Sequence, residues 1–423
     1  MTATSSTTAA ARRINGERLL QRIAELAEIG AIDGGGCNRL ALSDDDRLGR
    51  ERVIAWMQAL GLAITTDDVG NVTATWDVGS GKPVMTGSHI DTVRTGGKYD
   101  GNYGVLAGLE VIETCRDLGI TPGRPLAVAF FTNEEGARFA PDMLGSLVYV
   151  GGMSAGDAHD IVGIDGARLG DELSRIGALG TTPTPGPAPF AFVELHIEQG
   201  PVLEANDATI GAVSGVQGIS WTELTITGQS NHAGTTPMAL RHDAVFVAAK
   251  ITAHLRDVAL RYGGNQVCTV GKIDVHPNLV NVVAAKVTMT LDVRNTDEQV
   301  LRRAEAEIRE FWQDQARTEG VDIVDRRLAR FEPVVFDERV VSMVRRTAIG
   351  HGLRTMDLPS GAGHDAQMLA RVSPSAMIFV PSHRGISHNP AEHTDADDLV
   401  AGAQVLCDVM LQLAQCGDES DIG

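Results

Sequence analysis

Runs of strand length alternate with helical stretches along most of this chain, and this alternation restricts its possible folds more than any other feature. Short strand-like runs occupy residues 71–76, 83–87, 125–132 and 190–197. Helices are expected over 14–29, 45–60, 104–118 and 144–150. In the first of these, Leu19, Ile23 and Leu26 recur at helical spacing. The alternation predicts an α/β sheet with helices on its faces.

A self-contained unit interrupts this pattern in the second half of the chain. It contains a strand at 222–227, a helix at 243–260, strands near 266–275 and 286–293, and a helix at 298–319. Such a unit predicts a small α+β domain inserted into a larger one. A length of 423 residues also favours two domains. We therefore expect a first domain part over 1–212, an inserted domain over 213–331 and a second part over 332–423.

The composition excludes several classes of partner. The chain has 55 acidic and 36 basic residues and a net charge of −19, so its surface repels nucleic acid and anionic membranes. Its five cysteines are scattered and form no C-x-x-C pair, which favours a reducing, cytoplasmic location. The first 13 residues lack the apolar core of a secretory signal. They are expected to form a disordered tail, with an organelle transit segment as the alternative.

Four short segments place metal-capable side chains at the ends of predicted strands, where α/β sheets keep their sites. These side chains are His89, Asp91 and Asp100; Glu134 and Glu135; Glu194, His196 and Glu198; and His388 and Glu392. The first and third segments have residues two apart, so on an extended chain those side chains share a face.

Three of the four segments also have an ordinary structural explanation when taken alone, whereas the face shared by Glu194, His196 and Glu198 is too polar for a core unless it borders a site. His89 and Asp91 could share a metal ion, or Asp91 could orient His89, but a structural histidine beside a capping aspartate is equally typical. Glu134 and Glu135 form a costly like-charge pair unless cations lie nearby, although such pairs are also common in solvated turns. His388 alone is typical of a surface loop.

Taken together, the segments resemble the motif series of the hydantoinase/carbamoylase amidases. That family belongs to the dinuclear-metal superfamily of aminoacylases and carboxypeptidase-G2-like enzymes. The similarity keeps motif order and spacing from Arg39 to Asp395, nearly the whole chain. It implies an α/β fold in which a mixed-sheet metal hydrolase domain carries an inserted α+β dimerisation, or lid, domain.

The resemblance also implies a dinuclear metal centre. The matching ligand positions are His89, Asp100, Glu135, His196 and His388, with Asp100 bridging both ions. Nitrogen and oxygen ligands of this kind suit Zn²⁺, Mn²⁺ or Co²⁺. A pair of such ions acidifies a bound water, and Glu134 matches the general base and proton shuttle. The segment 360–365 matches a Gly-rich loop that lines the pocket, with His364 and Asp365 behind the ligands.

The inserted unit carries a second set of matching positions. His232, in the run 228–238, matches a histidine that reaches into the active site of the other subunit of a homodimer and donates to the developing oxyanion. Asn281 and Arg294 match positions that bind the substrate carboxylate, and Gln199 matches one that contacts the ureido or carboxylate end. A satisfied loop histidine and a surface ion pair are the alternatives for His232 and Arg294.

The resemblance predicts hydrolysis of the carbamoyl C–N bond of an N-carbamoyl-L-amino acid. Allantoate and 3-ureidopropionate present the same carboxylate and ureido groups, so they remain alternatives, as does an N-acyl amino acid or dipeptide. The chain reads Val283-Ala284-Ala285 where the family usually has Ile-Pro-Gly, which leaves the substrate side chain open. A non-catalytic binding protein is disfavoured, because every ligand position and Glu134 are intact.

Overall fold

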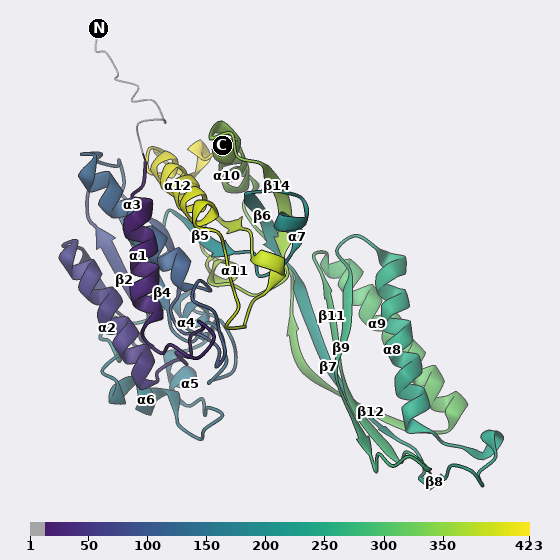
Figure 1. Ribbon diagram of the computed structural model, residues 1–423. Coiled ribbons are helices and arrows are strands. Elements are labelled where there is room, and N and C mark those ends of the chain that lie inside the picture. The colour runs from purple at the N-terminus through teal and green to yellow at the C-terminus, as the bar shows by residue number, and fades with distance from the viewer. Residues whose placement is uncertain (1–12) are drawn as a thin grey trace. The chain divides into compact units, whose positions relative to one another are not determined.

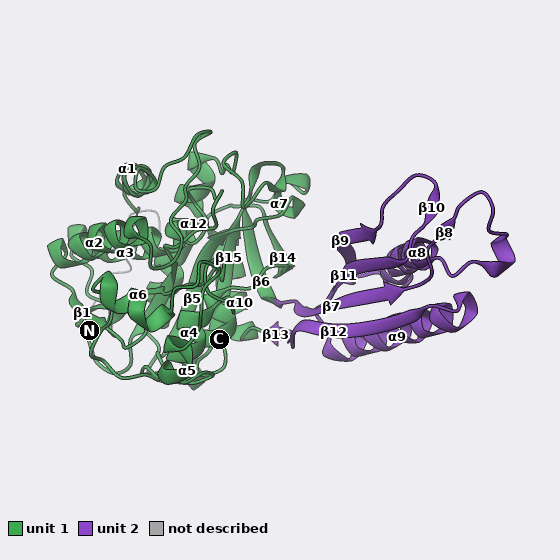
Figure 2. Cartoon of the chain, turned by 90° about the horizontal axis from the view of Figure 1, so that it is seen from below, with its two compact units in different colours: residues 1–215, 335–423 green, residues 216–334 purple. Residues whose placement is uncertain are grey.

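The computed structural model describes residues 13–423, so the expected N-terminal tail lies, apart from its last residue, outside the described residues. The chain forms two compact units (Figure 2). Unit 1 contains the residues up to 215 together with 335–423, and unit 2 contains 216–334. The chain passes between the units at 215/216 and at 334/335.

Unit 1 is built on a nine-stranded mixed sheet (Figure 1). Its strands are β1 (Ala63–Thr66), β2 (Val72–Trp76), β3 (Val84–His89), β4 (Leu126–Phe131), β5 (Ala191–Ile197), β6 (Ile210–Val216), β13 (Val334–Val335), β14 (Thr355–Ser360) and β15 (Ser375–Val380). The order is β1-β2-β4-β3-β5-β15-β6-β13, and β14 pairs with β6. The central strands β4, β3, β5 and β15 are mutually parallel, so their carboxyl ends meet at one edge of the sheet.

Helices cover the central strands of this sheet. Against β3, β5 or β15 lie α3 (Asn102–Asp117), α10 (Glu338–Gly350), α11 (Asp365–Leu369) and α12 (Ala396–Leu413), while α4 (Leu144–Tyr149) packs on β4. Further out lie α1 (Gly16–Ala27), α2 (Asp44–Ala59), α5 (Ala155–His159), α6 (Leu169–Arg175) and α7 (Val202–Ala205). Gly104 lets α3 approach the sheet closely, because a Cβ there would lie 2.4 Å from the Leu195 carbonyl oxygen. No helix within residues 13–423 is long and apolar enough to cross a bilayer.

Unit 2 is an antiparallel sheet packed on two helices. The strands β7 (Gly218–Thr227), β9 (Val267–His276), β11 (Lys286–Asn295) and β12 (Asp322–Phe331) have the order β12-β7-β11-β9. The helices are α8 (Ala244–Tyr262) and α9 (Glu298–Glu319), and the short strands β8 (Asn231–His232) and β10 (Val282–Val283) pair with each other. Alternate residues of β7 and β11, such as Leu224, Ile226 and Met289, are fully buried in one core with the helices.

The predicted α/β class with a mixed sheet is confirmed, but the sequence pattern missed β12. This strand lies at the edge of the unit 2 sheet, and most of its residues are exposed. Its sequence, DIVDRRLARF, therefore lacks the alternation of apolar and polar residues that a half-buried strand shows. Charged side chains on an edge strand also discourage pairing with other sheets.

The core of unit 2 yields a stability prediction. We expect Ile226→Ala to lower the free energy of unfolding by about 2–5 kcal/mol, because it leaves a cavity at a fully buried position. Val324→Ala on β12 is the matched control, because Val324 is 67% exposed, and we expect it to change stability by no more than about 0.5 kcal/mol. Chemical denaturation measures both. Equal losses in the free energy of unfolding for the two variants would show that Ile226 does not lie in a packed core.

Candidate metal centre

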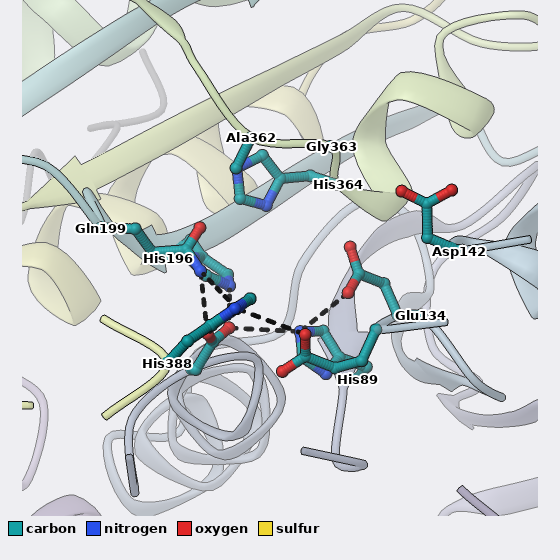
Figure 3. Close-up of a pocket in the computed structure, with 11 residues that line it drawn as sticks. His89, Glu134, Asp142, His196, Gln199, Ala362, Gly363, His364 and His388 are labelled. Atoms are coloured by element: carbon teal, nitrogen blue, oxygen red, sulfur yellow. Dashed lines mark hydrogen bonds and ion pairs between the residues drawn. The ribbon is translucent and has the colours of Figure 1, made fainter. Parts of the chain in front are cut away.

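The carboxyl ends of the central parallel strands bring the four polar segments together. His89 is the last residue of β3, Glu134 and Glu135 follow β4, and His196 lies near the end of β5. His388 lies in the loop after β15. Their side chains line a cavity of about 100 Å³ (Figure 3). This edge of the sheet is therefore the candidate functional site.

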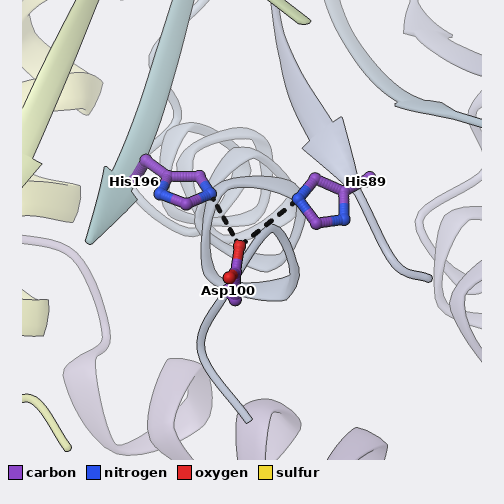
Figure 4. A group of neighbouring side chains, drawn as sticks. All are labelled: His89, Asp100 and His196. Atoms are coloured by element: carbon purple, nitrogen blue, oxygen red, sulfur yellow. Dashed lines mark ion pairs between the residues drawn. The ribbon is translucent and has the colours of Figure 1, made fainter. Parts of the chain in front are cut away.

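Asp100 lies between His89 and His196 (Figure 4). Its Oδ1 is 3.4 Å from Nε2 of His89 and 3.1 Å from Nε2 of His196. Its Oδ2 is 3.3 Å from Nε2 of His388, and that same nitrogen is 3.3 Å from Oε2 of Glu135. Asp100 thus belongs to two groups of potential metal ligands, one with His89 and His196 and one with Glu135 and His388.

Backbone contacts fix the orientation of two of the imidazoles. Nδ1 of His89 lies 2.9 Å from the carbonyl oxygen of Asp91, and Nδ1 of His196 lies 2.8 Å from that of Ile197. A carbonyl oxygen only accepts, so each Nδ1 carries a hydrogen. In the neutral rings the Nε2 lone pairs then point at Asp100, as metal-ligating histidines require. The N–H of Gly101 also donates to Nε2 of His196 at 3.1 Å.

The two glutamates after β4 are held in a costly environment. Burial raises the pKa of Glu134 well above its usual range, although His89, 3.4 Å away, opposes this. Burial and the charge of Asp100 raise the pKa of Glu135 to about 8. Carboxylates packed in this way favour bound cations, because a cation removes their mutual repulsion.

The pKa values of two imidazoles are raised as well, which for an imidazole favours the charged form. The hydrogen bond to Asp100 raises the pKa of His388 to about 9. Burial alone would lower the pKa of His89, but the charge of Glu134 and the hydrogen bond to Asp100 raise it well above its usual value. Protons thus balance the carboxylates here, at the positions that a divalent cation would take.

Asp91 orients His89, but through its main chain. Its carbonyl oxygen accepts from His89, as described above. Its buried carboxylate lies 3.3 Å from the backbone nitrogen of Glu134 and 3.4 Å from that of Glu135. Asp91 therefore ties the end of β3 to the turn after β4, and it belongs to none of the groups of potential metal ligands among the described residues.

The two glutamates of the third segment have different surroundings. Glu194 is fully buried, and its carboxylate accepts from the Ser88 hydroxyl at 2.6 Å and from the Ala366 backbone N–H at 2.7 Å. It also forms a third group of potential ligands with His196 and His364. Glu198 instead accepts the first backbone N–H groups of α7, at 2.7 and 2.8 Å. Glu198 is therefore a helix cap outside the cavity.

Arg39 and Glu392 hold the ligand-bearing loops, although the sequence marked Glu392 only as a metal-capable side chain, and it belongs to none of the groups of potential ligands among the described residues. Arg39 is fully buried and donates to the Ile90 carbonyl and to Oδ1 of Asn102, both at 2.7 Å. It thus joins the segment after His89 to the start of α3. Glu392 accepts from the backbone N–H groups of Tyr99 and Asp100 at 3.0 and 3.3 Å. Neither role has a local sequence signal, because both depend on contacts between distant segments.

Other residues complete the lining of the cavity. Gln199 donates from Nε2 to Oδ2 of Asp100 at 2.8 Å. The expected Gly-rich loop contributes Ala362, Gly363 and His364. Asp142 also lines the cavity, and no motif in the sequence pointed to it.

The predicted substrate residues of unit 2 fall at two separate places. His232 on β8 pairs with Val282, and the neighbouring Ala233 N–H donates to the Asn281 carbonyl at 2.9 Å. His232 and Asn281 are therefore adjacent. Arg294 pairs with Ile219 at the opposite end of β11. Its guanidinium contacts the Asp292 carboxylate at 2.8–3.1 Å.

Comparison with known proteins identifies the class to which this fold and site belong. Residues 85–412 match the family described as Peptidase family M20/M25/M40, and the chain belongs to that family. The family is metal-dependent, in agreement with the ligand groups at the sheet edge.

Particular relatives are similar over nearly their full length. An N-carbamoyl-L-amino-acid amidohydrolase of Rhizobium meliloti is 40% identical over 96% of this chain and 98% of its own. The allantoate amidohydrolase of Escherichia coli K12 is 38% identical over 92% of this chain and 96% of its own. The crystal structure of a hydantoinase/carbamoylase family amidase from Burkholderia multivorans is 42% identical, with a TM-score of 0.93 over 96% of this chain and 99% of its own.

The packing of His89 against Gly101 yields a prediction about metal affinity. Gly101 has φ of 65°, and a Cβ there would lie 2.4 Å from Nε2 of His89. We expect Gly101→Ala to displace the ring and to lower Zn²⁺ affinity at least about tenfold, as loss of ligand support does. Gly119→Ala is the matched control, with the same φ and open space around it. Chelator competition measures the Zn²⁺ affinity of each variant. Equal affinities would show that Gly101 does not position the His89 ring.

Proposed function

We propose that this chain is a metal-dependent amidohydrolase that removes the carbamoyl group from an N-carbamoyl-L-amino acid. The observation that carries this proposal is the centre itself, in which oriented imidazoles and an aspartate lie beside Glu134. The similarity of the chain to an N-carbamoyl-L-amino-acid amidohydrolase supports the same reaction. Allantoate is the second candidate substrate, because an allantoate amidohydrolase is similar at nearly the same level. We further place the enzyme in the cytoplasm, because scattered cysteines fit a reducing compartment.

Two divalent ions would be held by the five predicted ligands. One group is His89, Asp100 and His196, the other is Asp100, Glu135 and His388, and Asp100 is common to both. Nitrogen and oxygen donors without a thiolate fit Zn²⁺, Mn²⁺ or Co²⁺. Such ions supply a water of lowered pKa and a Lewis acid for the carbonyl oxygen.

Glu134 is the proposed general base. It is 7% exposed, lines the cavity and belongs to neither of the ligand groups that share Asp100. Its carboxylate takes a proton from the attacking water and later passes it to the departing nitrogen. The bond between the carbamoyl carbon and the amino acid nitrogen breaks. The products are the free amino acid and carbamate, which decays to CO₂ and ammonia.

The tautomer of His232 supports its proposed role at the oxyanion. Its Nδ1 accepts from the backbone N–H groups of Gly234 and Thr235 at 3.1 and 3.2 Å. In the neutral ring the hydrogen is therefore on Nε2. His232 thus presents a donor, as stabilisation of a developing oxyanion requires.

Arg294, Asn281 and Gln199 are the proposed substrate-binding residues. The Arg294 guanidinium is already oriented by Asp292 and lies over Trp221, 5.9 Å from the ring centroid. A guanidinium held in this way can bind a carboxylate with two parallel hydrogen bonds. Gln199, beside Asp100, would contact the ureido end.

The geometry of unit 2 favours a site shared between two subunits. Arg294 and Lys286 are at opposite ends of β11, which separates them by about 25 Å, and His232 lies beyond the Lys286 end. An N-carbamoyl amino acid spans only about 7 Å. If His232 and Arg294 both contact one substrate molecule, they therefore come from different chains.

The surface of unit 2 supports a homodimer. Its exposed large apolar side chains lie mostly on one edge, formed by α8, β9 and the loops next to them. They include Met238, Leu240, Phe246, Leu260, Ile273, Leu279 and Val280, which are 47% or more exposed. β9 is also an edge strand. Exposed apolar groups beside an unpaired strand are typical of an interface.

The reaction class is tested by ammonia release from the metal-loaded protein. The panel contains several N-carbamoyl-L-amino acids, allantoate, 3-ureidopropionate and N-acetyl amino acids, each with a chelator-treated control. We expect chelator-sensitive ammonia release from an N-carbamoyl-L-amino acid. Release of amine from N-acyl compounds alone would move the chain to the acylase or peptidase branch.

A substitution of Glu134 separates catalysis from metal binding. We expect Glu134→Gln to lower kcat by about 100-fold to 10,000-fold, because the amide cannot accept the proton of water. Metal content measured by mass spectrometry should stay unchanged. The control is Glu51→Gln at an exposed surface ion pair. Near-normal turnover in Glu134→Gln would remove Glu134 from the mechanism.

Mixing two inactive variants tests the shared site. His232→Ala and Arg294→Ala are unfolded, mixed and refolded together, so that mixed dimers form. In a mixed dimer one site receives both intact residues, so we expect activity to recover to about a quarter of wild type. If both residues served the site of their own chain, the mixture would stay as inactive as its parents.

A further inference from the structure

A second cavity, of about 260 Å³, lies in unit 2 between α9 and the strands β7, β11 and β12. We call it the α9 cavity. Figure 1 shows α9 beside this sheet. Its lining includes none of the residues of the proposed catalytic mechanism, and it is larger than the cavity of about 100 Å³ at the metal centre. The proposed function leaves it without a role.

The inner wall of the α9 cavity is apolar. Leu291 and Val293 of β11 face Ile308 and Trp312 of α9, and all four side chains are buried. Arg309 lies over the Trp312 ring, 5.3 Å from its centroid, and this contact holds the indole in place. The wall therefore suits an aliphatic or aromatic group.

The lining of the α9 cavity also contains a hydroxyl group, that of Ser220. Ser220 is 4% exposed and lines the cavity, and its hydroxyl makes no hydrogen bond to any other described residue. Thr222, two residues further along β7, lines the same side. A hydroxyl that no described residue engages can donate a hydrogen bond to a ligand in the cavity.

Three of the four charged residues that line the α9 cavity are basic, although the whole chain carries a net charge of −19. These four residues are Arg302, Arg309, Arg327 and Glu305. Arg302 and Arg309 are each paired with acidic side chains, and Glu305 is paired with Arg330. Arg327 forms no ion pair or hydrogen bond through its side chain with the described residues. It is therefore free to bind an anion.

We propose that the α9 cavity binds a small carboxylate with an apolar tail, such as an arylalkanoate. The carboxylate pairs with Arg327, the tail lies against Trp312 and Ile308, and the Ser220 hydroxyl donates to an oxygen of the ligand. Such a molecule satisfies the apolar wall, the hydroxyl and the uncommitted cation together. The proposal does not depend on the hydrolytic function, because the cavity lies wholly within unit 2.

The test uses the full metal-loaded chain with 4-phenylbutyrate as the probe and 4-phenylbutanol as its neutral counterpart. Titration calorimetry should give one site per chain with a Kd of about 1 mM or below. The alcohol should bind at least about tenfold more weakly, because it lacks the charge that Arg327 recognises.

Two variants locate the binding. Ala306→Phe fills the cavity from an exposed position on α9, so it should abolish binding without unfolding the chain. Arg327→Gln should weaken binding at least about tenfold. The matched control is Arg326→Gln, the next residue, which pairs with Glu223 and does not line the cavity. It should leave binding unchanged.

The proposal is overturned if wild-type protein does not bind the probe. It is equally overturned if Ala306→Phe and Arg327→Gln bind as wild type does, since the carboxylate would then occupy another place, such as the metal centre. Should Ala306→Phe fail to fold, Arg327→Gln against Arg326→Gln still decides the question.

Discussion

The arrangement of the site depends on one buried carboxylate that faces three imidazoles. Asp100 is 3% exposed and lies within 3.1–3.4 Å of Nε2 of His89, His196 and His388. Burial opposes its charge, but the hydrogen bonds to these rings hold the pKa of Asp100 well below its usual range. The anion is thus retained at a position from which it reaches both groups of potential ligands. The three imidazoles can surround the carboxylate only because the chain segments that carry these four side chains lie next to one another.

The sheet and a few buried polar groups bring those segments together. Four parallel strands end at one edge, so residues up to 300 positions apart in the sequence share a cavity. Arg39 then joins the end of β3 to α3, and Glu392 joins the loop of Asp100 to the C-terminal loop. Gly101 keeps the space that the His89 ring occupies. The precision of the centre therefore comes from contacts around the ligands as well as from the ligands.

The sequence predicted much of the fold because most elements have a clear period. The helix expected at 298–319 has those bounds, and the family resemblance is confirmed by the comparisons. The roles of the site residues stay predictions, although those of unit 1 lie together as expected. The roles of Arg39 and Glu392 and the position of Asp142 could not be predicted, since each depends on contacts with residues distant in the sequence. The separation of His232 from Arg294 also could not be predicted, because it follows from the register of β11.

The role of Asp100 is tested most directly by the metal content of the loaded protein, measured together with anomalous diffraction at the metal absorption edge. We expect two divalent ions in each chain, with the Asp100 carboxylate bound to both. We also expect Asp100→Asn to lose this pair while the chain stays folded. A single ion, or two ions that do not share Asp100, would show that Asp100 does not hold a dinuclear centre.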